Sequence, residues 1–133
     1  ALTRAHYLTG DERYLAAAVR ATQFTLGANP MNHTMTTGVG HDWPRNPLHV
    51  DARNTGMEPP RGITVYGNTD PARAPGWVKQ WVLGKDLHPE IGEWPAAQAY
   101  FDVGNWPEVT EYTVHQSIGP VAYYWGYLAA APR

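Results

Sequence analysis

The sequence of 133 residues contains no cysteine, which excludes disulfide bonds and metal sites with thiolate ligands. Its histidines do not occur in a ligand spacing such as HExxH, so we expect no metal ion, and no motif indicates another cofactor. No apolar run approaches the roughly 18 residues of a membrane-spanning helix, and the first residues lack the order of a signal peptide. The Lys and Arg residues are scattered and the net charge is -2, so we expect neither nucleic acid nor a membrane as a partner.

The motifs of nucleophilic hydrolases and phosphate loops are absent as well. The chain has no GxSxG sequence and no Cys/His pair, and the GVG at residues 38 to 40 lies far from any strand-to-helix junction. A hydrophobic content of 43% with 17% charged residues is typical of one folded globular domain. The six Trp and eight Tyr residues either fill a core between loops or present rings to a ligand, and composition leaves both open.

The first third of the chain predicts helices. Thr9 and Glu12 in TGDE have the spacing of a capping box, so a helix should begin there and run over residues 11–26 until Gly27. Its apolar stripe recurs at spacings of three and four, at Leu15, Val19, Thr22 and Leu26. The apolar spacing of residues 2–8 indicates the end of a preceding helix.

From residue 28 to about residue 94 no periodicity survives, because breaker sequences such as NP, WP, EPP and APG recur. We expect short extended pieces over 35–39 and 63–66, and short helical turns over 77–83 and 95–101. The last segment, 112–130, has a helical apolar stripe that should be buried, with Gly119 and Pro120 predicting a kink. These helices cannot cover so much loop, so we expect a piece of a larger helical structure.

Glu108 and Glu111 in NWPEVTEYTVHQ raise the question of acid catalysis. On one helix, Glu111 and His115 would face the same side, one turn apart. Burial among Trp106 and Tyr112 would favour the protonated acid, whereas a helix N-terminus would favour the ionised form, and the sequence does not decide between them. The alternative is a solvated or capping glutamate.

Hydrolysis of a glycosidic bond requires a second carboxylate, which in inverting enzymes lies about 6.5 to 9.5 Å away. The sequence marks none of its other candidates as a base; they are Asp42, Asp51, Asp70, Asp86, Glu90, Glu93 and Asp102. We therefore expect the partner of Glu111 to lie outside this chain.

Two stretches, LGANPMNHTMTTGVG (26–40) and PEVTEYTVHQSIGPVAYYWGYLA (107–129), together resemble the C-terminal part of glycoside hydrolase family 9. TGDERYLAAAVRATQFTLGANP is similar to a late barrel helix of that family and its GxNP loop. TTGVGHDWPRNPLH and RGITVYGNTD are similar to two of its loop motifs. This family contains inverting cellulases and endoglucanases.

The resemblance implies an all-α fold, a segment of an (α/α)6 barrel (a six-hairpin toroid) with long irregular loops. Residues 1–133 would form the C-terminal portion of a glycosidase catalytic domain, an incomplete barrel that depends on a missing N-terminal part. It implies cleavage of β-1,4-glucan or related β-linked oligosaccharides or polysaccharides, in a secreted or periplasmic location. The family's catalytic base, an Asp pair in a DAGD-type motif, is absent here, so the fragment alone should be inactive.

By this resemblance Glu111 is the general acid. His49 stands in the family's substrate-contacting HHR motif, where Leu48 and Val50 depart from the pattern and Arg53 is a shifted substitute. Ser117 replaces the usual Asn of NExAIxxN, which indicates a divergent branch. Further sugar contacts are expected from side chains near these motifs, namely Trp43, Tyr66, Trp106 and His115.

Two other functions fit the same residues. A non-catalytic carbohydrate-binding or structural helical piece would use the aromatic loops and hydrolyse nothing. A polysaccharide lyase on a helical toroid would need a Tyr or His near an Arg, and its product would absorb in the ultraviolet.

Overall fold

A computed structural model describes residues 1–83 and 87–131, and in this part of the chain the regular structure is helical. The α-helices are α1 (Leu2–Thr9), α2 (Glu12–Thr25), α3 (Val50–Thr55), α4 (Pro107–Thr110) and α5 (Gly119–Ala130). Short 3-10 turns occupy Pro71–Arg73, Ile91–Glu93 and Ala96–Gln98, and π-turns occupy Val78–Val82 and Val114–Ile118. The described residues contain no strand, only one antiparallel bridge between Thr36 and Thr64. The all-α prediction is therefore confirmed.

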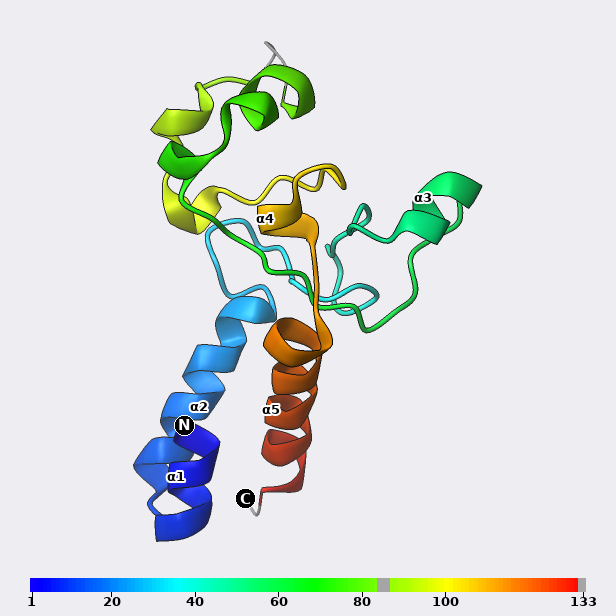
Figure 1. The fold of residues 1–133 in the computed structure, drawn as a ribbon. Helices are drawn as coiled ribbons and strands as arrows, with labels where there is room; N and C mark the ends of the chain where they lie inside the picture. The colour runs from blue at the N-terminus through cyan, green and yellow to red at the C-terminus, as the bar shows by residue number, and fades with distance from the viewer. Residues whose placement is uncertain (84–86, 132–133) are drawn as a thin grey trace.

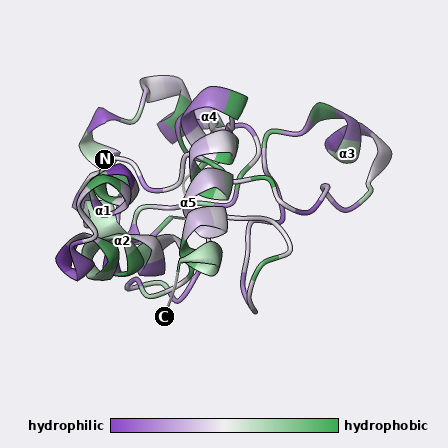
Figure 2. Cartoon of the chain, turned by 90° about the horizontal axis from the view of Figure 1, so that it is seen from below, coloured by the Kyte–Doolittle hydropathy of each residue, from purple (hydrophilic) through white to green (hydrophobic). Residues whose placement is uncertain are grey.

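Three helices form one body and the loops form another layer beyond it. In Figure 1, α1, α2 and α5 run side by side, while α3, α4 and the irregular segments lie past one end of α2 and α5. Viewed from below in Figure 2, α3 projects away from this helical group. The candidate site therefore has to be sought where the loops meet the start of α5.

The junction of α1 and α2 confirms the predicted helix but corrects its cap. Gly10 takes the left-handed conformation that ends α1, and its N–H donates to the carbonyl of His6. Asp11, and not Thr9, is the N-cap of α2, because its carboxylate accepts the Arg13 N–H at 2.9 Å. Hydrogen bonds from Arg13 lower the pKa of Asp11 to about 2. The capping box of Thr9 and Glu12 was wrong because Asp11 reaches the first free N–H groups.

The last helical segment begins later than the sequence predicted. It starts at the π-turn Val114–Ile118, which Thr113 caps by accepting the Gln116 N–H, and it continues directly into α5. Gly119 donates to the Val114 carbonyl, and a Cβ at Gly119 would lie 2.6 Å from that oxygen. Pro120 occupies the first turn of α5, where its missing N–H breaks no bond inside that helix.

The helices leave apolar surface open. No described residue of α5 is buried, so the burial predicted for its stripe is not found within this part of the chain. Val19 on α2 and Leu26, the residue that follows α2, are 41% and 44% exposed. Figure 2 shows hydrophobic segments along both helices. The buried clusters lie instead in the loop layer, one around Trp106, Val109 and Val78 and one made of Met35, Ile63 and Val65.

Candidate active site

Three segments that are distant in sequence meet at residues 109–111. The Leu48 N–H donates to the Thr110 carbonyl at 2.9 Å, which joins the loop before α3 to this stretch. On the other side, the Tyr66 N–H donates to the Glu111 carbonyl at 2.9 Å and the Gly67 N–H donates to the Val109 carbonyl at 3.0 Å. These backbone bonds fix where Glu111 lies relative to the loops around Leu48 and Tyr66.

Glu111 is the residue that ends α4. Its N–H donates to the Pro107 carbonyl at 3.0 Å, and its own backbone is extended, with φ -70° and ψ 159°. The side chain is half-buried and makes no hydrogen bond or ion pair within the described residues. The backbone is thus held on both sides, while the carboxyl group has no hydrogen-bond partner among the described residues and is available to a ligand.

The predicted helical pairing of Glu111 with His115 was wrong. Glu111 caps the end of α4, whereas exposed His115 lies in the π-turn that begins at Val114, so the two do not share a helix. The physical reason is Pro107, which starts a separate short helix and thereby places Glu111 at its C-terminal end.

His49 lies beside this stretch and is oriented by two contacts. Its Nδ1 accepts the Ala52 N–H at 3.1 Å, which makes it the N-cap of α3. Its ring stacks on that of Tyr112, with centroids 6.4 Å apart and planes 13° from parallel. Because Nδ1 acts as an acceptor, the neutral ring carries its proton on Nε2, where it can donate to a ligand.

Tyr112 was not singled out by the sequence as a support for His49. It packs on the cluster of Met35, Ile63 and Val65 and is half-buried. Burial, with a further contribution from the charge of Asp51, raises the pKa of Tyr112. The only sequence signal for a role of Tyr112 was its place directly after Glu111. Its stacking partner His49 lies in a loop whose path the sequence does not predict.

Arg53 is engaged with the protein itself. Its guanidinium donates to the Gly104 carbonyl at 3.1 Å and to the side chain of Asn105. These bonds tie α3 to the turn that precedes α4. The structure therefore gives Arg53 a role in holding the loop layer together. The sequence had predicted it as a sugar contact.

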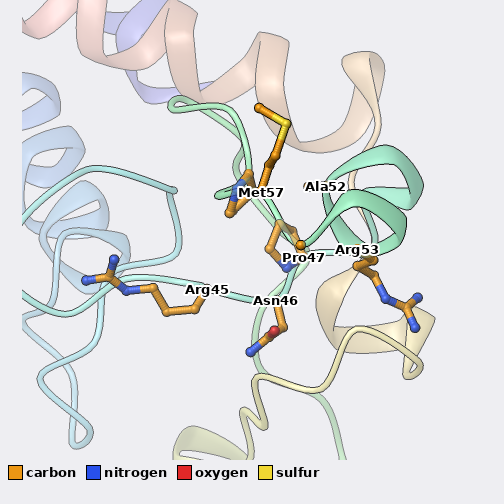
Figure 3. Close-up of a pocket in the computed structure, with 8 residues that line it drawn as sticks. Arg45, Asn46, Pro47, Ala52, Arg53 and Met57 are labelled. Atoms are coloured by element: carbon orange, nitrogen blue, oxygen red, sulfur yellow. The ribbon is translucent and has the colours of Figure 1, made fainter.

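A hollow of about 320 Å³ lies beside α3 and is lined by Arg45, Asn46, Arg53 and Met57 among others. Figure 3 shows how these side chains lie. The guanidinium groups of Arg45 and Arg53 extend in opposite directions, away from each other. Arg45 lies instead over the ring of Trp43, 3.6 Å from its centroid, and pairs with Glu58 at 3.3 Å. The two arginines thus do not converge on an anion.

Two of the remaining predicted sugar contacts differ in accessibility. Tyr66 is 37% exposed and lines a groove with Gln116 and Ser117, at the start of the final helical segment. Trp43 is buried, with 8% of its surface exposed, and Arg45 covers one face of its ring. Tyr66 is therefore partly accessible from this groove, whereas the face of Trp43 that lies under Arg45 is closed.

Trp106 was wrongly predicted as a sugar platform. Its side chain is 0% exposed and its ring stacks on Phe101 at 5.7 Å, within the cluster that contains Val78 and Val109. A ring with no exposed surface cannot present a face to a sugar. Trp106 is a core residue of the loop layer.

Several of the candidate partner carboxylates are held by their own surroundings. Asp102 accepts backbone N–H groups of Arg45 and Asn46, Asp70 caps a 3-10 turn, and Asp42 contacts His33. Asp86 lies outside the described residues. None of these contacts points to a base that would act with Glu111.

Within residues 1–83 and 87–131, no group of three or more His, Asp or Glu side chains is arranged to hold a metal ion. In the same ranges, no helix is both long enough and apolar enough to cross a membrane.

No protein-family model and no curated protein matches the sequence. The structure is similar to the crystal structure of a metagenome-derived glycoside hydrolase family 9 endoglucanase, with a TM-score of 0.70 and 26% sequence identity. The match covers 96% of this chain and 20% of that protein, so the chain spans about a fifth of its length. The fold is that of an all-α segment of an (α/α)6 barrel, as the sequence predicted, and it is similar to a segment of a glycoside hydrolase.

Proposed function

We propose that this chain is the acid-bearing part of an inverting glycoside hydrolase that cleaves β-1,4-glucan or a related β-linked oligosaccharide. The observation that carries the proposal is the setting of Glu111, whose backbone is bonded on both sides while its carboxyl group has no partner among the described residues. The similarity to a family 9 endoglucanase supports the reaction class.

In this mechanism the protonated carboxyl of Glu111 donates its proton to the oxygen of the leaving sugar as the glycosidic bond breaks. A carboxylate on the opposite face of the ring accepts a proton from the attacking water, which requires a separation of about 6.5 to 9.5 Å from Glu111. We place that base outside this chain, in the part of the catalytic domain that completes the barrel. Glu111 then regains its proton from solvent for the next cycle.

The neighbours of Glu111 would position the sugar. Nε2 of His49 donates to a sugar hydroxyl, and the exposed ring of Tyr66 contacts the apolar face of a pyranose. Arg53 contributes by holding residues 104–105 against α3. His115, which is exposed on the first turn of the final helical segment, remains a candidate contact at the edge of the same site.

The stereochemistry of the product tests the proposal. The polypeptide that contains this chain is incubated with cellotetraose, and the anomeric protons of the new reducing ends are followed by NMR before mutarotation. An inverting mechanism produces the α-anomer first. Initial β-anomer would contradict inversion, an unsaturated product absorbing in the ultraviolet would indicate a lyase, and saturable binding without products would indicate a binding protein.

Substitutions of His49 distinguish its role as the N-cap of α3 from its proposed hydrogen bond to a sugar. His49→Asn should leave the free energy of unfolding nearly unchanged, because Asn is also a favoured N-cap, but should raise KM about tenfold through loss of the Nε2 donor. His49→Ala should raise KM equally and also destabilise the protein by about 1 kcal/mol. Denaturant titration and steady-state kinetics measure the two effects. An unchanged KM in His49→Asn would mean that His49 caps α3 and does not bind the sugar.

A further inference from the structure

A second hollow lies outside the group of segments that meet at Glu111. It has a volume of about 390 Å³ and lies between the loop of residues 31–45 and the segment 94–102, with His33, Asp42, Trp43, Trp94, Gln98 and Tyr100 among its lining residues. Glu111, His49 and Tyr66 are not among the residues that line it. Its size falls in the range of small-molecule binding sites.

The aromatic walls of this hollow are held in fixed positions. The Trp94 indole N–H donates to the Pro89 carbonyl at 2.9 Å, and its ring meets Phe101 edge-on at 5.2 Å. Tyr100 stacks on His33 with centroids 4.9 Å apart, and its hydroxyl donates to Asp102 at 3.0 Å. A half-buried Trp that is fixed at its N–H end offers a ring surface at little cost in side-chain entropy.

Polar groups with unused hydrogen-bonding capacity stand beside this aromatic surface. The Asp42 side chain is 60% exposed, and its Oδ2 contacts Nδ1 of the buried His33 at 3.0 Å, which leaves Oδ1 without a hydrogen bond among the described residues. Gln98 is exposed, and its amide group makes no hydrogen bond in that part of the chain. One accepting carboxylate and one donating and accepting amide therefore line the same hollow as the ring of Trp94.

This combination fits a neutral pyranose. The C–H face of a sugar ring packs on an aromatic ring, while hydroxyl groups donate to a carboxylate and exchange hydrogen bonds with an amide. An acidic sugar fits poorly, because Asp42 would repel its charge and the guanidinium of Arg45 is already paired with Glu58.

We propose that the hollow between residues 31–45 and 94–102 is a carbohydrate subsite that binds one neutral sugar unit of the substrate chain away from the cleavage point. The identity of the sugar as part of a β-linked glucan rests on the function proposed above. The subsite would contribute binding energy and take no part in proton transfer, so its loss would raise KM and leave kcat unchanged.

Fluorine NMR tests this site directly. The polypeptide that contains this chain is labelled with 5-fluorotryptophan in the Glu111→Gln background, in which turnover should be about 10² to 10⁴-fold slower, and is titrated with cellotetraose. The Trp94 signal is assigned by its loss in Trp94→Phe. We expect this signal to move saturably, while that of Trp81, which is 76% exposed and lies outside the hollow, stays in place.

Two substitutions test the contacts. Trp94→Ala removes the NMR signal and is therefore followed through KM in the polypeptide with Glu111 intact; it should weaken cellotetraose binding to this site about tenfold. Gln98→Ala, which removes an exposed side chain and therefore tests the site even if Trp94→Ala misfolds, should weaken it about threefold. Gln80→Ala is the matched control, an exposed glutamine outside the hollow that should bind like the parent.

A Trp94 signal that does not move up to the solubility limit of the sugar would overturn the subsite, as would equal affinities of Gln98→Ala and Gln80→Ala. A different result would contradict the proposed function, namely hydrolysis of cellotetraose by Glu111→Gln at the rate of the wild type. A moving Trp94 signal together with that result would keep the sugar site and reject Glu111 as the acid.

Discussion

Glu111→Gln should lower kcat on an unactivated β-linked oligosaccharide by about 10² to 10⁴-fold in the polypeptide that contains this chain. Gln has nearly the same shape as the protonated Glu but cannot release a proton to the leaving oxygen. The main-chain bonds of Glu111 to Pro107 and Tyr66 do not involve its side chain, so the substitution should leave the local structure intact. Initial rates on cellotetraose, with KM measured separately, give the result.

Glu108→Gln is the matched control for that substitution. Glu108 lies three residues earlier, is exposed and belongs to the first turn of α4, where its carboxylate faces solvent. We expect the kcat of Glu108→Gln to equal that of the wild type within about twofold, because the proposed mechanism does not use the Glu108 carboxylate. Equal losses in both variants would mean that the effect is one of local charge and not of proton donation.

Trp106→Ala should lower the free energy of unfolding by about 3 to 5 kcal/mol, the range for removing a large aromatic side chain from a packed core. The Trp106 side chain is 0% exposed and contacts the ring of Phe101, so its removal leaves a cavity that these neighbours fill only in part. Denaturant titration of the same polypeptide, followed by circular dichroism, measures this loss.

Two variants sharpen the test of Trp106. Trp106→Phe should lower the free energy of unfolding clearly less than Trp106→Ala, because an aromatic ring remains. It also removes the buried indole N–H, which has no partner within the described residues. Trp81→Ala, at a ring that is 76% exposed, should change stability by no more than about 0.5 kcal/mol. A Trp106→Ala variant that keeps full stability but loses sugar affinity would restore the platform interpretation.

The helical part of the fold could be predicted from sequence because its signals are local. Apolar spacings of three and four residues predicted α1 and α2, and Gly27 marked the end of α2 to within two residues. The short helix α4 could not be predicted, because the four residues Pro107–Thr110 are too few to show a period. That omission produced the wrong pairing of Glu111 with His115.

The candidate site was harder to predict because its contacts join distant segments. The bonds from Leu48 to Thr110 and from Tyr66 to Glu111 depend on loop paths that breaker residues such as Pro and Gly do not specify. Burial was the second difficulty. Trp106 and Tyr66 look alike as aromatic residues in loops, yet one is fully enclosed and the other is 37% exposed.

The rate of Glu111→Gln on substrates with different leaving groups tests the central claim most directly. A leaving group such as 2,4-dinitrophenolate departs without a proton, so the loss of the acid matters only when the leaving group is a sugar alcohol. We predict a kcat ratio of wild type to Glu111→Gln of about 10² to 10⁴ on cellotetraose and close to 1 on a dinitrophenyl β-cellooligosaccharide. An equal loss on both substrates, or no loss on cellotetraose, would contradict the assignment of Glu111 as the proton donor.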